Sequence, residues 1–275
     1  MKETERQFPS GMSRADWADS LIFLGSGGAR IVIAKQVRAS GGIWFTLSNT
    51  QFLVDPGPGA LVRATGSRHR LDPTHLSGII LSHRHLHHSA DVNVMIEAMT
   101  MGGTEPRGKL FAPGDALEGE DPVVFRYLRK FLEEVVVLKE GGQYDLGPVL
   151  FTCPVRHQHR GEVYGFRFTW DKYTLSYIAD TAYFPELARH YQADVVIYNV
   201  VRYKPSNLDH LHLPEVEELI KVMKPRLAIM THFGMTMIRS KPWKLAQEVS
   251  ERTGCEVIAA SDGMKLELSR YLRAP

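Results

Sequence analysis

Four histidines fall within six residues of this chain. They are His83, His85, His87 and His88, in the segment 81–91. Four protonated imidazoles so close together would repel one another, and burying them without partners would be costly. A shared metal ion removes both problems, because neutral imidazole is a common metal ligand. We therefore interpret the segment as a metal site rather than as a solvated, histidine-rich turn.

The residues on either side predict the backbone that carries these histidines. Residues 78–81 form a short apolar run, which is typical of the end of a buried strand. The apolar residues that follow the segment have helical spacing: Val92, Val94, Met95, Ile96 and Met99. The histidines are thus expected on a strand-to-helix loop, where a rigid scaffold can direct several imidazoles at one point.

Other histidines also lie at the ends of predicted strands or in loops. Nine of the 12 fall in four clusters: the 83–88 segment, His157 with His159, His210 with His212, and His232. Asp180 closes a predicted strand as well. A carboxylate among imidazoles suits a site for two metal ions, because it can bridge both ions and lower their repulsion. Mixed nitrogen and oxygen ligands favour zinc, with iron, manganese, nickel or cobalt as alternatives.

Composition excludes several classes of protein. The chain has 275 residues, of which 44% are hydrophobic and 23% charged, so a sizeable core is expected. A net charge of +2 does not by itself indicate a nucleic-acid or membrane partner. Two cysteines, Cys153 and Cys255, provide no disulfide framework. With neither an apolar run of about 18 residues nor a signal peptide, we expect a soluble, cytoplasmic protein that does not associate with membranes.

Strand patterns dominate the first half of the chain, and strands alternate with helices in the second half. Early strands are predicted at 21–24, 30–34, 43–47 and 51–55, and a helix at 122–132. Residues 25–28 are glycine-rich but lack the Lys-Ser/Thr of a phosphate loop and open onto the predicted strand 30–34, so we interpret them as a turn. Residues 1–18 are expected to form a loose arm, and residues 1–275 a single domain.

These motifs resemble those of the metallo-β-lactamase-fold hydrolases, whose family loop H-x-H-x-D-H follows a strand. Here the loop reads His83-Arg84-His85-Leu86-His87-His88. The stretch from His159 to Phe166 is similar to the His-x-x-Glu-x-Tyr-Gly element of the branch that holds tRNase Z endonucleases and small phosphodiesterases, and Thr231-His232 to its closing element. The resemblance covers nearly the whole chain. It implies an αββα sandwich of two mixed β-sheets, with helices outside and metals at one rim.

The resemblance also implies a role for each matching residue. The first ion would be held by His83, His85, His159 and Asp180. The second would be held by His87, His88, Asp180 and His232. His157 is the rival to His159, and its other role would be to donate a hydrogen bond from behind the ligands. His210 would assist the leaving group as an acid, with His212 as its rival. Asp55, in an Asp-x-Gly element, is either structural or the partner that orients a ligand histidine.

His87 stands where the family usually has aspartate. Aspartate there binds the second metal ion and accepts a hydrogen bond from the attacking water. Imidazole can bind the metal but brings no negative charge, so the site becomes one charge more positive. The substitution favours a weaker second site, a different metal or reduced catalysis.

The resemblance predicts a metal-dependent hydrolase that acts on a small-molecule or nucleotide phosphodiester. One alternative is an RNA-processing endonuclease, but residues 102–121 are too short and too weakly basic for the arm with which tRNase Z grips tRNA. A second is a catalytically weakened metal-binding scaffold, suggested by His87 and by the number of arginines and lysines. Lactone or thioester hydrolysis is a further alternative. The flavin-linked di-iron proteins differ by a glutamate in the first loop and an added flavodoxin domain.

Overall fold

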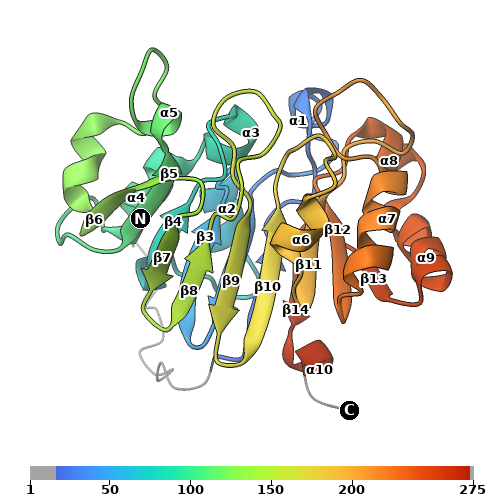
Figure 1. The fold of residues 1–275 in the computed structure, drawn as a ribbon. Coiled ribbons are helices and arrows are strands. Elements are labelled where there is room, and N and C mark those ends of the chain that lie inside the picture. Colours follow the sequence, from blue (N-terminus) through green and yellow to red (C-terminus); the bar gives the residue numbers. More distant parts are fainter. Residues whose placement is uncertain (1–16, 273–275) are drawn as a thin grey trace, which may run out of the picture.

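Two β-sheets lie face to face between outer helices in the computed structural model, which describes residues 17–272 (Figure 1). Within those residues the first sheet has seven strands, in the order β14 (Met264–Glu267), β1 (Ser20–Phe23), β2 (Ile43–Leu47), β3 (Thr50–Val54), β4 (Leu76–Ile80), β5 (Lys109–Pro113) and β6 (Glu134–Leu138). The second also has seven described strands, in the order β13 (Glu256–Ala259), β12 (Leu227–Thr231), β11 (Val195–Asn199), β10 (Tyr173–Ile178), β9 (Phe166–Trp170), β8 (Val149–Thr152) and β7 (Gln143–Leu146).

Both sheets are mixed. β3 to β6 run parallel in the first sheet and β10 to β13 run parallel in the second, while the remaining neighbours pair antiparallel. The predicted αββα sandwich of two mixed sheets is therefore confirmed. Parallel strands matter for the site, because their carboxyl ends and the loops that follow them lie at the same edge of a sheet.

The main core lies between the two sheets and is rich in aromatic side chains. Phe45 of β2 and Phe52 of β3 stack at 4.9 Å between ring centroids, and Phe168 of β9 packs on them from the other sheet at 5.3 and 5.2 Å. Offset and tilted aromatic pairs of this kind add to the free energy gained from burial. Since both sheets contribute to one core, we keep the single domain as a proposal.

Helices cover the outer face of each sheet through separate apolar clusters. On the first sheet lie α2 (Ala60–Thr65) and α4 (Val92–Met99). On the second lie α6 (Leu187–Tyr191), α7 (Leu213–Met223), α8 (Met235–Arg239) and α9 (Pro242–Thr253). Shorter helical segments are α5 (Gly114–Leu117), α10 (Ser269–Leu272) and the 3₁₀ turn Pro73–His75. None of the helices within residues 17–272 combines the length and apolar character that a membrane crossing requires.

The strand predicted at residues 30–34 is wrong, because these residues form helix α1 (Arg30–Ala34). β-Branched side chains suggested a strand, but β1 is already paired on both sides, with β2 and β14. With no sheet edge beside it, the segment forms a helix, in which only Val32 is buried. The turn at 25–28 therefore opens onto a helix, although it still lacks a phosphate-loop lysine.

Two other predicted elements need correction. Residues 122–132 form a 3₁₀ turn (Arg126–Phe131) instead of a full α-helix. There the Arg129 guanidinium donates to the carbonyl oxygen of Val124, which would accept from the N–H of Leu128 in an α-helix. The histidine loop contains a short helix, α3 (Leu86–Ser89), which carries His87 and His88. Of the arm predicted at 1–18, residues 1–16 lie outside the described residues.

Candidate metal centre

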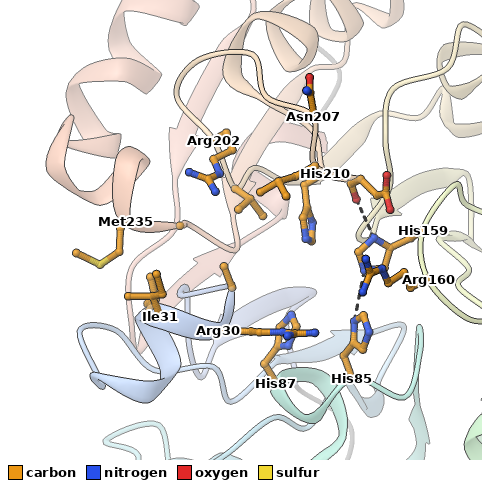
Figure 2. Close-up of a pocket in the computed structure, with 16 residues that line it drawn as sticks. Arg30, Ile31, His85, His87, His159, Arg160, Arg202, Asn207, His210 and Met235 are labelled. Atoms are coloured by element: carbon orange, nitrogen blue, oxygen red, sulfur yellow. Dashed lines mark hydrogen bonds between the residues drawn. The ribbon is translucent and has the colours of Figure 1, made fainter.

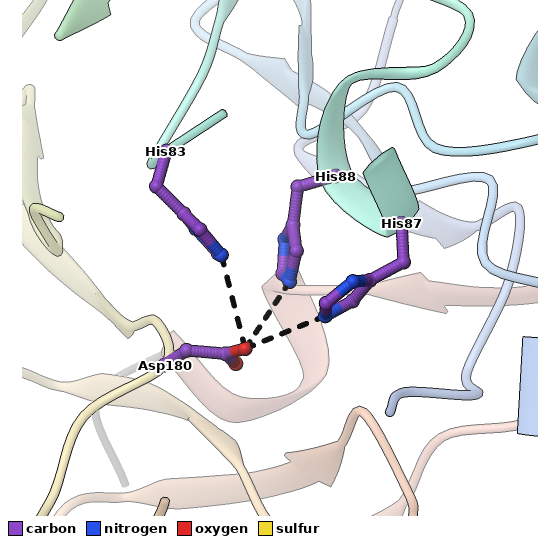
Figure 3. Close-up of side chains that lie close together, drawn as sticks. All are labelled: His83, His87, His88 and Asp180. Carbon is purple, nitrogen blue, oxygen red and sulfur yellow. Dashed lines mark ion pairs between the residues drawn. The ribbon is translucent and has the colours of Figure 1, made fainter. Parts of the chain in front are cut away.

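The residues predicted to bind metal come together at one edge of the two sheets, beyond the ends of parallel strands. His83 follows β4, Asp180 follows β10 and His232 follows β12. Figure 3 shows His83, His87 and His88 directed at the carboxylate of Asp180. Short connections after these strands bring together residues that are up to 149 positions apart in sequence, from His83 to His232 (232 − 83).

Asp180 lies at the centre of this group, with its side chain fully buried. Four imidazole nitrogens lie near its Oδ2 atom: His88 Nε2 at 3.4 Å, His87 Nε2 at 3.5 Å, His210 Nδ1 at 3.6 Å and His83 Nε2 at 3.9 Å. Oδ1 lies 3.4 Å from Nδ1 of His232 and accepts a 2.9 Å hydrogen bond from the Asn199 amide. One carboxylate thus stands between histidines from several loops, as a bridging ligand would.

A second group joins His83, His85 and His159. Nδ1 of His85 lies 2.9 Å from Nε2 of His83 and 3.4 Å from Nε2 of His159. Nδ1 of His159 lies 2.8 Å from the carbonyl oxygen of Asp209, to which it can only donate, so its Nε2 carries a lone pair. His85 has a single Nδ1 and cannot donate to both neighbours, so a shared cation fits this group better than hydrogen bonding.

Asp55 is buried behind the histidine segment and orients two of its imidazoles. Oδ2 of Asp55 accepts hydrogen bonds from the Ser82 hydroxyl at 2.7 Å, the Tyr177 hydroxyl at 2.8 Å and Nδ1 of His88 at 2.9 Å. The Ser82 hydroxyl uses its one proton in the hydrogen bond to Asp55, so its oxygen accepts a hydrogen bond from Nδ1 of His83, at 2.9 Å. Nε2 of His83 is left with a lone pair that faces the site, and Nε2 of His88 faces the site as well.

His157 lies beside the site but has no free nitrogen to offer a metal. Its Nδ1 donates to the backbone carbonyl of Asp180, at 3.2 Å, and its Nε2 accepts from the Tyr191 hydroxyl, at 2.8 Å. The side chain is buried and supports the Asp180 loop from behind. Of the two rivals, the structure brings His159 to the histidine group and leaves His157 as a hydrogen-bond donor.

The second pair of rivals is separated in the same way. Nδ1 of His210 is buried near Asp180, and His159, Asp180 and His210 each offer a ligand atom within 4.8 Å of the others. His212 instead caps α7, since its Nδ1 accepts from the backbone N–H of Glu215 and its own backbone N–H donates to the Glu215 carboxylate. Of these two rivals, the structure brings His210 to the candidate metal centre and leaves His212 at the start of α7.

Burial keeps most of these imidazoles neutral. It lowers the pKa of His87 to about 4, with the nearby His88 adding to the effect. Burial also lowers the pKa of His83 and of His232 well below the usual histidine value. His88 differs: burial works to lower its pKa, but the carboxylates of Asp55 and Asp180 outweigh it and raise the pKa to about 10. Neutral imidazole is the form that binds a metal.

Unsatisfied polar atoms converge at the centre of the site and fit divalent metal ions. Within residues 17–272, four buried atoms there have no hydrogen-bond partner: Asp180 Oδ2, His87 Nε2, His210 Nδ1 and His232 Nδ1. Leaving such a group unpaired costs about 1–3 kcal/mol. Burial works to raise the pKa of Asp180, but the histidines around it, His232 foremost, hold it well below the usual value. An ionised carboxylate among imidazoles that are neutral except for His88 is a suitable ligand set for zinc or a similar ion once His88 gives up its proton.

A pocket of about 480 Å³ opens beside the histidines (Figure 2). Three arginines line it: Arg30, Arg160 and Arg202. None of the three was singled out from the sequence, because they lie on separate segments without a shared motif. The hydrogen-bonding roles of Ser82, Tyr177 and Asn199 were also missed. The position of Asn199 could have been noticed in the sequence. It is the last residue of β11, and Asp180 follows the neighbouring parallel strand β10, so both side chains lie at the same edge of the sheet.

The fold and the site define a class of protein: a metallo-β-lactamase-type sandwich with a histidine and aspartate centre at its rim. Residues 50–233 match the model of the family described as "Beta-lactamase superfamily domain", and the chain belongs to that family. It is also similar to the uncharacterized protein MJ1374 of Methanocaldococcus jannaschii, at 34% identity over 257 residues that cover 90% of this chain and 94% of that protein.

Solved structures share the fold at lower identity. The metallo-β-lactamase-fold protein YhfI from Bacillus subtilis is 20% identical with a TM-score of 0.72, over 90% of this chain and 99% of its own. A diphosphatase of the PhnP family is 20% identical with a TM-score of 0.67, over 91% and 97%. The short form of human tRNase Z is 16% identical with a TM-score of 0.63, over 90% and 98%. The resemblance to this superfamily is confirmed by the family model, and these structures share its fold.

Proposed function

We propose that the protein is a metal-dependent phosphodiester hydrolase with two divalent ions, zinc first among the alternatives. The observation that carries the proposal is the buried Oδ2 atom of Asp180, which has four imidazole nitrogens within 3.9 Å and no hydrogen bond. The first ion would be held by His83, His85, His159 and Asp180. The second would be held by His87, His88, Asp180 and His232.

The protein's own residues would orient these ligands and handle the proton of the leaving group. Ions at these positions would act as Lewis acids and lower the pKa of a coordinated water. Asp55 and Ser82 hold Nε2 of His83 and His88 toward the site. His210 lines the pocket. As water attacks phosphorus and the bond to the leaving oxygen breaks, His210 would donate a proton to that oxygen.

Two observations support a small phosphodiester over a β-lactam or a tRNA. The arginines of the pocket suit an anionic substrate. Residues 102–121, where a tRNA-gripping arm was considered, contain β5, which lies inside the first sheet between β4 and β6. That stretch therefore serves the fold. The fold-level similarity to a PhnP-family diphosphatase and to tRNase Z supports the proposal by analogy.

Metal content is the first test. Purified protein should contain between one and two divalent ions per chain by elemental analysis. Asp180→Ala should release both ions and lower the melting temperature, because the ligand atoms would face one another unsatisfied. Asp171→Ala, at the turn between β9 and β10, is a control that should keep the metal. Absence of metal from wild-type protein grown with zinc and purified without chelator would refute the proposal.

Turnover by His210→Ala separates an enzyme from a scaffold. Loss of a positioned acid should reduce hydrolysis of an unactivated phosphodiester by about 10²–10⁴-fold and affect a nitrophenyl ester much less, because nitrophenolate leaves without a proton. Metal content should stay near that of wild type. Equal losses on both substrates, or loss of metal, would make His210 a ligand. His212→Ala is the matched control: it should remove about 1 kcal/mol of stability through the α7 cap and leave turnover unchanged.

A further inference from the structure

The pocket beside the histidines has walls of two kinds. Its charged wall consists of Arg30, Arg160 and Arg202, and its apolar wall includes Ile31, Val201, Leu208 and Met235. Arg30 begins α1, Arg160 directly follows His159, and Arg202 lies in the segment after β11. Figure 2 shows Arg30 near His87, Arg160 near His159, and Arg202 on the part of the pocket away from His85. The charges therefore surround the space next to the candidate metal centre.

These three guanidinium groups have no acidic partner within residues 17–272. Other arginines do: Arg84 pairs with Asp115, Arg252 with Glu217. Nε of Arg202 is also buried without a hydrogen-bond partner. Leaving this buried Nε without a partner is costly. A guanidinium is also the group best suited to bind phosphate or carboxylate with two hydrogen bonds.

We propose that the substrate is a small phosphodiester that carries a second anionic group, bound by Arg30, Arg160 and Arg202. This inference rests on the proposed function, because it places the second group relative to the bond that is cleaved. The apolar wall would hold the ring or alkyl portion between the two groups. A volume of about 480 Å³ is in the range of sites for small ligands. A phosphorylated dinucleotide has these features and serves as the probe.

Binding is measured first, with a ligand that cannot be cleaved. Two adenosine dinucleotides with a methylene phosphonate linkage are compared by calorimetry on metal-loaded protein, one with and one without a 5′-phosphate. The phosphate should tighten binding by about tenfold or more, the worth of a charge-assisted pair. Arg202→Gln should remove most of this difference. Arg30→Gln and Arg160→Gln, at exposed positions, should each reduce it and keep the test valid if Arg202→Gln fails to fold.

Arg63→Gln provides the charge-matched control. Arg63 is exposed on α2 and lines a different pocket, so the preference for the phosphorylated ligand should persist. A preference below about twofold in wild type, or one that survives in all three pocket variants, overturns the inference. Hexa-adenylate binding more than about tenfold tighter than the phosphorylated dinucleotide overturns it too, because the occupant would then be a polymer that continues past Arg202 to Lys204 and Arg239.

Hydrolysis of the two natural dinucleotides distinguishes failure of the anion-site inference from failure of the proposed function. If both are hydrolysed with equal kcat/KM, the proposed function stands and the second anionic group is refuted. If the phosphorylated analogue binds selectively but neither natural dinucleotide is cleaved, the anion site stands and phosphodiester hydrolysis of this substrate is refuted. Selective binding together with a KM lowered about tenfold for the phosphorylated substrate supports both.

Discussion

Hydrogen bonds fix the candidate ligand histidines one by one. Nδ1 of His83 donates to Ser82, Nδ1 of His88 to Asp55, and Nδ1 of His159 to a backbone carbonyl. Each bond holds the ring with its Nε2 toward the site, and removing such a partner should weaken metal binding. His87 is the exception: in the described part of the chain no group hydrogen-bonds its ring, although Nε2 is buried 3.5 Å from Asp180.

His87→Asp tests what this exception means for the metal. The structure shows that His87 points into the site, so the substitution changes a group that faces Asp180. Aspartate adds a negative charge and a second oxygen that can accept a proton from water, so we expect the second ion to bind about tenfold tighter, with higher phosphodiester turnover. Metal titration and activity are measured on the same preparations.

His87→Asn is the control, because it has the size of aspartate without its charge, and it should weaken the second ion. Equal weakening by aspartate and asparagine would show that the shorter side chain does not reach the metal. A change of metal identity toward zinc together with loss of activity would show that imidazole is selected for a different ion.

At the scale of elements, the glycine-rich turn before α1 supports the loop that carries His232. The N–H of Phe233 donates to the carbonyl of Ser26 at 2.9 Å, and the N–H of Gly28 donates to the carbonyl of Phe233 at 3.1 Å. A Cβ atom on Gly28 would lie 2.2 Å from Nδ1 of His232. Glycine is therefore required because another segment passes close to its backbone, and not because of the turn alone.

Gly28→Ala should displace His232 and reduce occupancy of the second ion. The first ion, proposed to be held by His83, His85, His159 and Asp180, should remain. We expect a loss of about one ion per chain by elemental analysis and a fall in turnover. Gly59→Ala is the control: its φ of 82° makes alanine strained there, but no atom lies within 4 Å of the added Cβ. It should cost about 1 kcal/mol of stability with unchanged metal content. Full metal occupancy in Gly28→Ala would contradict this account of the turn.

Across the whole molecule, the buried histidines link folding to pH in the metal-free protein. Burial lowers the pKa of His87 and of His157 to about 4, so the folded chain binds fewer protons than the unfolded chain between about pH 4 and 6.5. Their contribution to stability is therefore lost as pH falls through this window. His88, with a pKa raised to about 10, acts in the opposite direction and stabilises the folded state below about pH 6.5, an effect lost as pH rises through 10.

Metal-free protein should consequently be less stable at pH 5 than at pH 7. His87 and His157 should each contribute about 1–2 kcal/mol to the difference, since one pKa unit corresponds to about 1.4 kcal/mol. The free energy of unfolding is measured by urea titration in the presence of chelator, at pH 5, 7 and 9. Stability that rises between pH 7 and pH 5 would contradict the burial of neutral imidazoles, and a flat profile would show that they open to solvent without metal.

The sequence alone was sufficient for the fold class and for most of the candidate ligands. Strand and helix patterns are local, and His83, His85, His87 and His88 are neighbours in the chain, so spacing and motif place them together. Asp180 and His232 end or follow predicted strands, where a parallel sheet delivers side chains to one edge. The strand at 43–47 was predicted with the bounds that the structure shows.

Tertiary structure decided what depends on partners distant in sequence. His157 and His159 differ because Tyr191 and the Asp180 carbonyl occupy both nitrogens of the first, and His210 and His212 differ because the second caps α7. Residues 30–34 form a helix instead of a strand because both edges of β1 are already paired. The three arginines share no motif, and only folding brings them to one pocket. In each case the role or conformation of a residue depends on the partner of a hydrogen bond, of a strand edge or of a charge. Those partners lie far away along the chain.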